Sequence, residues 1–371
     1  MNIGFDAKRA LFNRSGLGNY SRSTIGLLSR FYPDNKYYLF SARNSPELLQ
    51  PSYNQFIIEP TPGLSASFPS LWRSWGIHHQ IKNRKLDIFH GLSNELPWSI
   101  KRCGVKSVVT IHDLIFLRYP EYYPFIDRQI YTIKFRHACQ VADKIIATSE
   151  STKQDIISFF GTDPKKIQVV YQTCDPVFSI PVSLEKKDEI KNKYNLPDRY
   201  ILYVGTIEKR KNALTLVKAY LKEDIVIPLL IAGKPTDYLV EINEYLKQNP
   251  SGDRIIFRHE IESVDLPALY QSAALFVYPS VFEGFGIPIL EALYSGIPVV
   301  TSTGSCFAET GGDAALYCNP NDAEEMGTLI TNILKDQDLI KTMKKKGFAH
   351  AQKFNEENVA ANLLRVYLNV L

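Results

Sequence analysis

Short apolar runs rich in β-branched and aromatic residues alternate with longer stretches in which apolar residues recur every three or four positions. The runs Asn2–Asp6 and Lys144–Ala147 predict strands, and the stretches Tyr20–Arg30 and Arg128–Val141 predict helices. This alternation is typical of α/β proteins with parallel sheets. Further strands are predicted at Tyr37–Phe40, Asp87–His90, Ser107–Ile111, Ile167–Val170, Tyr200–Val204, Pro228–Ala232, Arg254–Phe257, Leu275–Tyr278, Pro298–Thr301 and Ala315–Cys318. Further helices are predicted at Pro69–Arg84, Ser151–Phe159, Ala213–Glu223, Tyr238–Lys247, Leu266–Ser272, Pro288–Ser295 and Ala323–Lys335.

The alternation pauses once, in the lysine-rich segment Pro181–Arg199, which we interpret as the join between two domains with some helix of its own. The fold class predicted is therefore two doubly wound parallel-sheet α/β domains with a cleft between them, residues 1–178 and 179–354. The tail after Asp338 is expected to be helical to its end. In Glu356–Leu371 one apolar stripe recurs at helical spacing, made of Val359, Leu363, Val366, Tyr367 and Val370.

Composition narrows the class of protein. With 371 residues and 45% apolar side chains, the chain is long enough for two domains and too apolar for intrinsic disorder. Its five cysteines never take CxxC spacing, which argues against a disulfide scaffold or a zinc site and favours a reducing cytoplasm. The start resembles a strand rather than a secretory signal, and no apolar run approaches the ~20 residues that span a membrane. We expect a cytoplasmic protein that at most contacts a membrane surface.

The net charge of +4 is unevenly distributed. Residues 1–178 carry 22 Lys or Arg against 14 Asp or Glu, whereas the remainder carries 21 against 25. This asymmetry suggests an anionic partner for the first half, although scattered surface lysines would give the same count. A nucleic-acid binder is disfavoured, because neither a recognition helix nor an aromatic platform motif is present.

The segment Val277–Val300 has the strongest chemical pattern. A predicted strand ends before Glu283-Gly284-Phe285-Gly286, and Pro288 then suits the first turn of a helix that contains Glu291. Carboxylates accept hydrogen bonds from vicinal hydroxyls, and helix N-terminal amides bind negative oxygens. A sugar nucleotide offers both groups. The alternative is a glutamate that only caps its own helix.

Two other loops have residues suited to phosphate. Gly205-Thr206-Ile207-Glu208-Lys209-Arg210-Lys211-Asn212 follows a predicted strand, so Arg210 and Lys211 could clamp a diphosphate, the alternative being a solvated turn. In the first loop, Ala7–Tyr20, Gly16 and Gly18 precede a helical pattern, so their amides could approach an anion, or the glycines could serve a turn.

These segments together resemble the retaining nucleotide-sugar glycosyltransferases of glycosyltransferase family 4, which have the GT-B fold of two Rossmann-like domains. The resemblance rests on EGFGIPILEALYSGIPVV at 283–300 and GTIEKRKN at 205–212. It extends to SGLGNYSR at 15–22, DIFHGLSNELP at 87–97, TIHDLIF at 110–116, ADKIIATSESTKQDI at 142–156 and ETGGDAALYCNPNDAEEM at 309–326. In this family the final helix crosses back onto the N-terminal domain, which would explain the apolar stripe of residues 355–371.

The resemblance also implies roles for individual residues. Glu283 would bind hydroxyls of the transferred sugar with help from amides around Phe285 and Gly286, and Glu291 would hold the nucleotide ribose. Arg210 and Lys211, in the loop that starts at Gly205, would bind the diphosphate with Gly16 and Gly18 nearby. His112 would line the transferred sugar, although a histidine at a strand end is more often structural. The base pocket is expected near Arg258–Val264, at Glu260 and Ile261.

Two departures from the family pattern weaken parts of this assignment. Thr206 stands where some relatives have an arginine, which puts more weight on Arg210 and Lys211. Cys306-Phe307-Ala308-Glu309 lacks the usual pattern of a small residue, Leu or Ile, Pro and Glu. This leaves the geometry on the ribose and phosphate side of the site open.

The expected reaction is transfer of a hexose from a nucleoside diphosphate to a hydroxyl of a glycan or lipid-linked glycan, with retention. GDP-mannose is slightly favoured as the donor over a UDP-sugar. No metal or other cofactor is expected, because two cations and a helix dipole already face the phosphates and no DxD pair lies in the expected cleft. The alternatives are a non-catalytic nucleotide-sugar-binding protein and an epimerase of the same fold. Bacterial lipopolysaccharide or polysaccharide assembly is the context that the resemblance implies.

The acceptor should meet the basic N-terminal half. Leu64–Lys85 carries Trp72, Trp75 and Arg73 among other cations and histidines. Such rings could stack on sugars or dock on an anionic membrane, and the alternative is an amphipathic helix with its tryptophans in the core.

Overall fold

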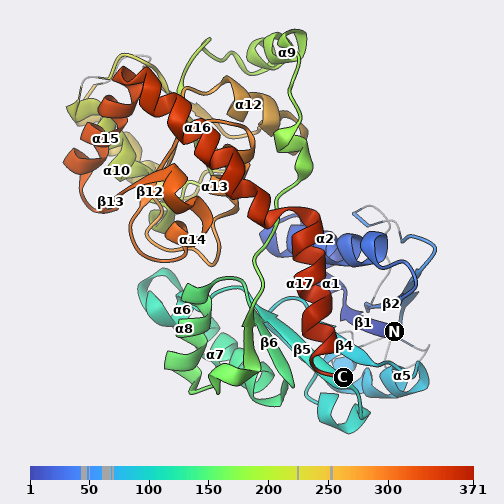
Figure 1. Cartoon of the computed structure of the whole chain (residues 1–371). Helices are drawn as coiled ribbons and strands as arrows, with labels where there is room; N and C mark the ends of the chain where they lie inside the picture. The colour runs from blue at the N-terminus through green and yellow to red at the C-terminus, as the bar shows by residue number, and fades with distance from the viewer. Residues whose placement is uncertain (43–47, 50, 61–67, 69–70, 224, 251–253) are drawn as a thin grey trace. The chain divides into compact units, whose positions relative to one another are not determined.

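The computed structural model describes the chain except for residues 43–47, 50, 61–67, 69–70, 224 and 251–253 (Figure 1). It divides into two compact units. Unit 1 comprises residues 1–172 and 356–371, and unit 2 comprises residues 173–355. The sequence had suggested a boundary six residues later, between 178 and 179.

Unit 1 is built on a seven-stranded parallel sheet in the order β3-β2-β1-β4-β5-β6-β7. Adjacent residues of its strands face opposite sides: Ile88 belongs to one core cluster and Phe89 to the other. Helices on both faces bury these side chains, as expected for a parallel sheet. The strands are β1 (Asn2–Asp6), β2 (Lys36–Phe40), β3 (Gln55–Ile58), β4 (Ile88–Gly91), β5 (Lys106–Ile111), β6 (Lys144–Ala147) and β7 (Ile167–Val169). The helices include α1 (Lys8–Phe12), α2 (Gly16–Phe31), the π-helix η1 (Trp72–Gly76), α5 (His78–Asn83), the 3-10 helix η2 (Ile100–Cys103), α6 (Ile115–Arg118), α7 (Phe125–Val141), α8 (Glu150–Phe160) and α17 (Glu356–Leu368).

Unit 2 repeats this plan with a six-stranded parallel sheet in the order β10-β9-β8-β11-β12-β13. Its strands are β8 (Ile201–Val204), β9 (Leu229–Ala232), β10 (Ile255–Arg258), β11 (Leu275–Tyr278), β12 (Val299–Ser302) and β13 (Ala315–Cys318). Its helices include α9 (Leu184–Tyr194), the 3-10 helix η6 (Lys209–Lys211), α10 (Ala213–Lys222), α11 (Tyr238–Gln248), α12 (Leu266–Ser272), α13 (Ile287–Tyr294), α14 (Phe307–Gly311), α15 (Ala323–Lys335) and α16 (Gln337–Ala351). The predicted two-domain, doubly wound α/β fold is therefore confirmed.

The helix α17 completes the core of unit 1 although it follows unit 2 in the chain. Its predicted apolar stripe, including Leu363 and Tyr367, is buried in the same cluster as Ile3 and Leu28. A polar contact supports this packing, because the Tyr367 hydroxyl lies 2.7 Å from Nδ1 of the buried His90 on β4.

Four local expectations are wrong. The segment Ala7–Tyr20 is not one loop, because it contains α1 and the first turn of α2. The strand β3 was not predicted. The segment predicted as one helix over Pro69–Arg84 contains the separate turns η1 and α5, with residues 69 and 70 outside the described part. The lysine-rich segment Pro181–Arg199 contains a helix as predicted, α9, but it is not the join, because α9 packs on α12 within unit 2 and the units divide between residues 172 and 173.

In each sheet the strand order reverses next to the first strand, between β1 and β4 in unit 1 and between β8 and β11 in unit 2. Open parallel sheets bind ligands beyond the carboxyl ends of the strands at such a reversal. Asp6 ends β1, and the Gly205 loop and the Glu283 loop follow β8 and β11. Ligand sites are therefore expected beyond the carboxyl ends of β1 and β4 in unit 1 and of β8 and β11 in unit 2.

Candidate active site

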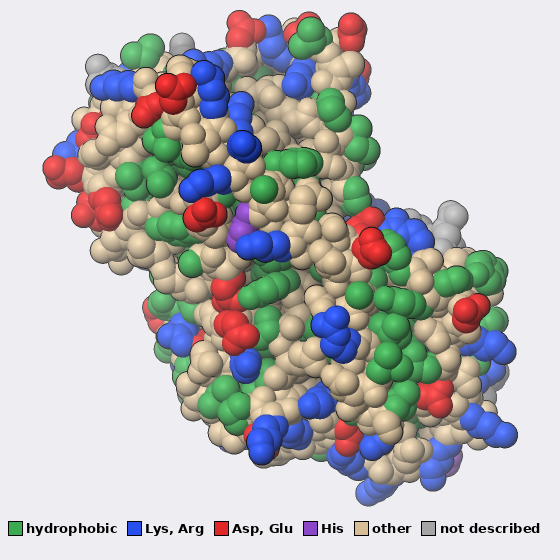
Figure 2. Space-filling view, in the orientation of Figure 1, with side chains coloured by type: hydrophobic (Ala, Val, Ile, Leu, Met, Phe, Trp, Pro, Cys, Tyr) green, Lys and Arg blue, Asp and Glu red, His purple; other side chains and the backbone are tan. Residues whose placement is uncertain are grey.

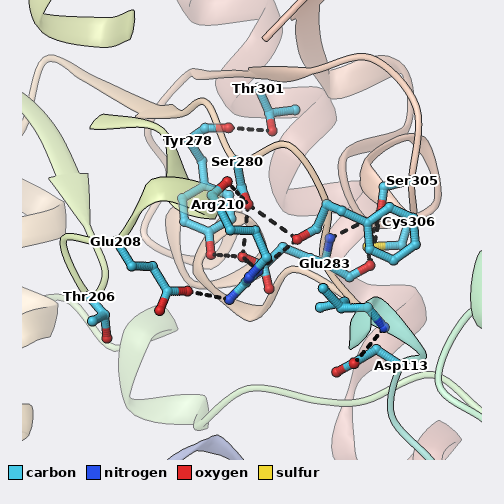
Figure 3. A network of polar contacts seen from close by, with 12 residues as sticks. Asp113, Thr206, Glu208, Arg210, Tyr278, Ser280, Glu283, Thr301, Ser305 and Cys306 are labelled. Carbon is cyan, nitrogen blue, oxygen red and sulfur yellow. Dashed lines mark hydrogen bonds and ion pairs between the residues drawn. The ribbon is translucent and has the colours of Figure 1, made fainter. Parts of the chain in front are cut away.

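Glu283 lies in the loop that joins β11 to α13, where its carboxylate collects three donors (Figure 3). The hydroxyls of Tyr278 and Ser280 donate to Oε1 over 2.7 and 3.0 Å. Nη1 of Arg210 lies 2.8 Å from the same oxygen. All of these contacts within the described part of the chain go to Oε1, so Oε2 is the oxygen that can accept from a ligand.

Arg210 connects the loops that follow β8 and β11. It belongs to η6, and its guanidinium contacts Glu208 at 2.5 Å and the carbonyl of Phe282 at 2.7 Å (Figure 3). Its own carbonyl accepts from the amide of Val281 over 2.8 Å. Arg210 therefore holds the Glu283 loop in position through these contacts, and it also places a positive charge at the edge of that loop.

The electrostatics favour an ionised Glu283. Burial is the largest single influence and opposes ionisation, but the charges of Arg210 and Lys211 together with hydrogen bonds from Tyr278 and Ser280 outweigh it. The pKa of Glu283 is consequently lowered. A carboxylate with one oxygen fixed by three donors is well prepared to accept hydrogen bonds from hydroxyl groups.

The segment that departs from the family pattern supports this loop directly. The Ser305 hydroxyl lies 3.1 Å from the amide of Glu283 and 2.8 Å from its carbonyl, and the Cys306 thiol donates to the same carbonyl over 3.2 Å. Cys306 therefore has a structural role here, and burial raises the pKa of its thiol. Cys306, within the unusual segment, and its neighbour Ser305 therefore both hold the Glu283 backbone in position.

Lys211 is the cation beside Arg210 that remains accessible to a ligand. Its ammonium lies 5.6 Å from the centroid of the Tyr278 ring and next to Gly205, the first residue after β8. No ion pair involves it within the described residues, whereas Arg210 already has carboxylate partners. Its charge contributes to the lowered pKa of Glu283 and opposes the rise in the pKa of Glu291 that burial causes, so it acts on both carboxylates.

Helix α13 begins directly after the Glu283 loop. Gly286 precedes it with a φ of 92°, a conformation that glycine adopts without strain. Pro288 lies in the first turn, as predicted, and Phe285 is buried against Phe354. The Phe285 carbonyl accepts from the Thr310 hydroxyl. The N-terminus of α13 therefore lies at the same edge as Glu283, where the helix dipole favours an oxyanion.

Glu291, on α13, accepts a hydrogen bond of 2.9 Å from the hydroxyl of Tyr270. Burial is the main influence on its carboxyl and raises its pKa to about 7, against the opposing effects of Tyr270 and Lys211. Glu283 and Glu291 are thus held in different protonation regimes by their surroundings.

The proposed base pocket lies on the loop after β10, the outermost strand beyond β9. Glu260 is exposed and Ile261 is half-buried. Arg258, at the end of β10, donates to the carbonyls of Tyr194 and Asn195 and so fixes the base of this loop. Because all strands of the sheet run parallel, this loop opens at the same edge as Gly205 and Glu283.

The remaining predicted residues belong to unit 1. Gly16 and Gly18 lie in the first turn of α2, whereas we had placed them ahead of it. Gly18 is required by close packing, since a Cβ there would lie 1.8 Å from the carbonyl oxygen of Asn13. At Gly16 a Cβ would meet nothing within 4 Å. The two glycines therefore have different structural demands.

His112 follows β5 and is buried. Its Nε2 lies 2.9 Å from the carbonyl of Leu92, so this nitrogen carries the proton and Nδ1 is left as an acceptor. Burial lowers the pKa of His112 to about 4, although the Leu92 hydrogen bond opposes this. Tyr20, on α2, packs edge-on against the imidazole with ring centroids 4.5 Å apart. The fold thus brings α2 and His112 together, with the histidine neutral.

Comparison with known proteins agrees with these features. The family model described as "Glycosyltransferase Family 4" matches residues 25–178, and the model described as "Glycosyl transferases group 1" matches residues 186–350. O-antigen chain mannosyltransferase B of Escherichia coli is 33% identical over 296 residues, which cover 77% of this chain and 75% of the relative. The chain belongs to the group 1 glycosyltransferases of family 4.

This family 4 glycosyltransferase has further relatives and neighbours. The serotype-specific mannosyltransferase WbdA of Escherichia coli is 31% identical over 74% of this chain, which spans 35% of that longer protein. Among solved structures, sucrose-phosphate synthase from Thermosynechococcus elongatus superposes with a TM-score of 0.79 at 21% identity, covering 100% of this chain and 98% of that one. Anabaena HepE in complex with UDP-glucose gives a TM-score of 0.78 at 16% identity, and each chain is covered completely. The predicted GT-B fold is confirmed, and the chain is a glycosyltransferase enzyme.

Several residues of this candidate site were not predicted from the sequence. Tyr278 and Ser280 hold the Glu283 carboxylate, and Tyr270 holds Glu291. Tyr278 could have been suspected, because it ends a strand five residues before the key glutamate. Tyr270 comes from a separate helix, α12, and had no local signal.

The described residues contain neither a metal-binding cluster nor a helix that could span a membrane. They contain no cluster of three or more His, Cys, Asp or Glu side chains arranged to hold a metal ion. Within the same residues, every helix is too short or too polar to cross a bilayer.

Proposed function

We propose that this glycosyltransferase transfers mannose from GDP-mannose to a hydroxyl of a glycan or lipid-linked glycan, with retention of anomeric configuration and without a bound metal. One observation carries the proposal: Arg210, Lys211 and Glu283 meet beyond the carboxyl ends of β8 and β11, where the sheet order reverses. The names of the relatives support the sugar, since those from Escherichia coli and Salmonella typhimurium are mannosyltransferases of O-antigen chains.

Glu283 would select and orient the transferred sugar. Its Oε2 can accept from one or two sugar hydroxyls, while the three donors on Oε1 fix the carboxylate. Since both oxygens are then engaged in hydrogen bonding, Glu283 is better placed as a hydroxyl acceptor than as a covalent nucleophile.

The leaving diphosphate would be stabilised by fixed positive groups. Lys211 has no ion-pair partner within the described residues, so its charge is available to the phosphates, and Arg210 and the α13 amides lie at the same edge. Preorganised groups of this kind supply most of the rate enhancement in many enzymes, and losing one donor costs about 3 kcal/mol. Such a site would need no divalent ion.

Retention would then follow from attack on the face from which the diphosphate departs. The bond between the anomeric carbon and the β-phosphate oxygen breaks, the acceptor oxygen bonds to that carbon, and the acceptor proton moves to the departing phosphate oxygen. Glu291 is held by Tyr270, which suits a role in binding the ribose hydroxyls. In unit 1, Gly16 would add an amide near the phosphates, whereas the Gly18 amide already donates to the Ser15 carbonyl over 2.9 Å. The neutral His112 would accept from a hydroxyl of the transferred sugar through Nδ1.

A UDP-sugar is the second candidate donor. The observation that favours it is the fold match to HepE, whose structure was solved with UDP-glucose. The base would lie at the Glu260–Ile261 loop in either case, where backbone contacts would distinguish guanine from uracil.

Nucleotide binding and product analysis test the proposal together. In a thermal-shift panel, GDP and GDP-mannose should raise the melting temperature more than UDP, ADP or their sugars, because selective binding stabilises the native state. Incubation with GDP-mannose and a mannan oligosaccharide in EDTA should then release GDP and give an α-linked mannosyl product by NMR. Preference for UDP would transfer support to the second candidate. A β-linked product would contradict retention, and loss of activity in EDTA would contradict metal independence.

We also propose that unit 1 contacts an anionic membrane surface. Exposed cations lie in and just after α5, at Lys82, Arg84 and Lys85. Figure 2 shows blue Lys and Arg side chains in the region of unit 1 where α5 lies. Helix α7 adds an exposed apolar face next to Arg128 and Arg136. The exposed fractions of this apolar face are 65% for Phe125, 71% for Ile126, 43% for Ile130 and 57% for Ile133. Apolar groups beside cations suit an interface with anionic headgroups.

Vesicle flotation tests this contact. The full chain should float with vesicles containing phosphatidylglycerol and sink with neutral phosphatidylcholine vesicles. The variant Ile126→Ser should bind the anionic vesicles less well while keeping its melting temperature, because the side chain is exposed. No flotation at low salt would refute membrane contact and would leave the transferase proposal unaffected.

A further inference from the structure

Unit 1 has a second polar centre at its own reversal of strand order, the counterpart of the Glu283 site in unit 2. Asp6 is the last residue of β1, and Glu95 follows β4 by four residues. The strands β1 and β4 are the neighbours between which the order reverses. This is the position where open parallel sheets bind ligands.

Four charged side chains converge there. Arg73 contacts Asp6 through Nη2 at 2.5 Å and Nε at 2.7 Å, and it contacts Glu95 through Nη1 at 2.9 Å. Lys134, from α7, lies 3.3 Å from the other oxygen of Glu95. The Asp6 side chain is 7% exposed, and those of Arg73 and Glu95 are 20% and 23% exposed. The cluster therefore presents donors and acceptors at a partly open surface.

Arg73 comes from η1, a single π-helical turn that also carries Trp75. Such turns are rare and are often found at functional sites. The turn was predicted as ordinary helix, and its two tryptophans differ: Trp72 is 3% exposed in the core, whereas Trp75 is 50% exposed. The sequence left two interpretations of these tryptophans, packing in the core and stacking on a ligand. The first applies to Trp72, and the second applies to Trp75.

Beside the charges lies a row of stacked rings. Trp98 stacks on Trp75 with an interplanar angle of 12°, and on His137 of α7 with centroids 3.8 Å apart. Trp98 is 36% exposed, so the row presents an aromatic surface to solvent. Flat aromatic surfaces next to carboxylates suit sugars, whose rings present C–H groups on one face and hydroxyls at the edge.

His137 supplies a buried polar atom with no hydrogen-bond partner. Among the described residues nothing bonds its Nε2. A neutral imidazole has one nitrogen that donates and one that accepts, so this atom can bond a hydroxyl group in either role. Buried polar atoms are rarely left without a partner, so this atom points to a ligand or a water molecule.

The space available matches one hydroxyl group. Asp6, Arg73, Glu95, Trp98, Lys134 and His137 all line a recess of about 20 Å³, enough for one water molecule. The recess is too small for a sugar ring, so a ring would remain outside it on the tryptophans.

We propose that this recess and the exposed parts of Trp75 and Trp98 bind a sugar residue of the glycan acceptor, with the sugar ring against the tryptophans and one hydroxyl directed to Glu95 and His137. The inference rests on the proposed function in that the acceptor is a glycan. It adds a saccharide-binding subsite to unit 1, built from Asp6, Arg73, Trp75, Glu95, Trp98 and His137.

The three tryptophans of the chain provide a direct test. The full chain labelled with 5-fluorotryptophan is titrated with the methyl glycosides and α-linked disaccharides of mannose, galactose, glucose and N-acetylglucosamine, and followed by fluorine NMR. Trp75→Phe and Trp98→Phe assign the resonances. At least one saccharide should shift the Trp75 and Trp98 resonances saturably and leave that of the buried Trp72 unchanged. If no saccharide shifts either resonance, the subsite does not exist.

Matched variants separate binding from structure. Trp75→Ala should weaken saccharide binding about tenfold. Tyr53→Ala, which removes another exposed aromatic ring of unit 1, should leave saccharide binding unchanged. His137→Phe keeps a ring against Trp98 and removes the unpartnered ring nitrogen, so it should also weaken binding. Wild-type affinity in Trp75→Ala would overturn the proposal.

The nucleotide measurements keep this inference distinct from the proposed function. If GDP raises the melting temperature and saccharides do not bind, the subsite fails and the donor assignment stands. If a saccharide binds with the expected shifts and no nucleotide stabilises the chain, the subsite stands and the donor assignment fails.

Discussion

Arg210 and Glu283 form an ion pair of 2.8 Å that joins the loops following β8 and β11. These strands are neighbours in the sheet, so the pair fixes the two sides of the strand-order reversal against each other. The proposed diphosphate clamp and the proposed sugar-binding carboxylate are therefore parts of one unit. A ligand that draws Arg210 toward phosphate would also affect the position of Glu283.

The charged residues of this site should control catalysis more than folding. Glu283→Ala and Lys211→Ala are each expected to lower turnover at least a hundredfold, because each removes one preorganised group from the transition state. The matched control is Lys209→Ala: Lys209 is 65% exposed and lies 3.6 Å from Glu241, so turnover should change little. Steady-state GDP release measures the effect, and circular dichroism checks the fold. Near-normal turnover in Glu283→Ala or Lys211→Ala would refute the assignment.

Glu291 should make stability depend on pH. Its pKa is about 7 in the folded protein against an ordinary value of 4.5, so the folded state holds a proton that the unfolded chain has lost between these values. This contribution to stability is complete below pH 4.5 and is lost as the pH rises to 7. Glu291→Gln should therefore raise the free energy of unfolding at pH 8 by about 2 kcal/mol relative to wild type and have little effect at pH 4.5. Urea titrations at both pH values measure this, and an equal effect at the two would contradict it.

Gly16 and Gly18 provide a contrast within one helical turn. Gly18→Ala should destabilise unit 1 by about 2 kcal/mol, because the new methyl group would collide with the backbone of Asn13. Gly16→Ala should leave stability equal or slightly higher, since the position is open and alanine favours helix. Thermal unfolding compares the two variants. Equal effects would show that the α1–α2 junction adjusts easily.

The buried hydroxyl of Tyr367 should stabilise the docking of α17. It lies 2.7 Å from Nδ1 of His90, whose other nitrogen lies 2.8 Å from the Thr110 hydroxyl. Tyr367→Phe would leave a buried histidine nitrogen without its partner, at a cost of about 1 to 3 kcal/mol. Urea unfolding of unit 1 monitors this, with Tyr53→Phe as an exposed control. An unchanged midpoint would mean that the hydroxyl contact contributes nothing.

Acid should weaken unit 1 through the same histidine. Burial, with a smaller effect of His112, lowers the pKa of His90 to about 3 from an ordinary value of 6.5. The unfolded chain therefore binds a proton that the folded state refuses, and stability falls as the pH drops from about 6.5 toward 3. His90→Gln should flatten this dependence in urea titrations between pH 7 and pH 4.5. A slope as steep as in wild type would assign the acid sensitivity to other groups.

The sequence predicted most strands and helices because each apolar run had to be buried in a sheet covered on both faces. The strand β3 was not predicted because QFII is short, begins with a polar residue and lies at the sheet edge between proline-containing segments. The helix α1 escaped because KRALF has cations at its start, and only Ala10 and Leu11 are buried.

For the candidate site, local motifs identified Arg210, Lys211, Glu283 and Glu291. Their supporting residues could not be predicted in the same way, because Tyr270 and Ser305 reach them from separate elements. The cluster in unit 1 shows the same limit: Arg73 is separated from Asp6 by 67 residues, and no local pattern indicates that they form an ion pair.

The position of α17 has a consequence for biosynthesis. A ribosome makes nearly all of unit 1 first, then all of unit 2, and only afterwards the helix that covers Ile3 and Leu28. During translation the apolar groove for α17 stays uncovered while some 180 intervening residues are added, a period in which exposed surface of this kind invites aggregation or chaperone capture. Unit 1, although most of it is synthesised first, is therefore expected to complete its folding only after unit 2 has been synthesised.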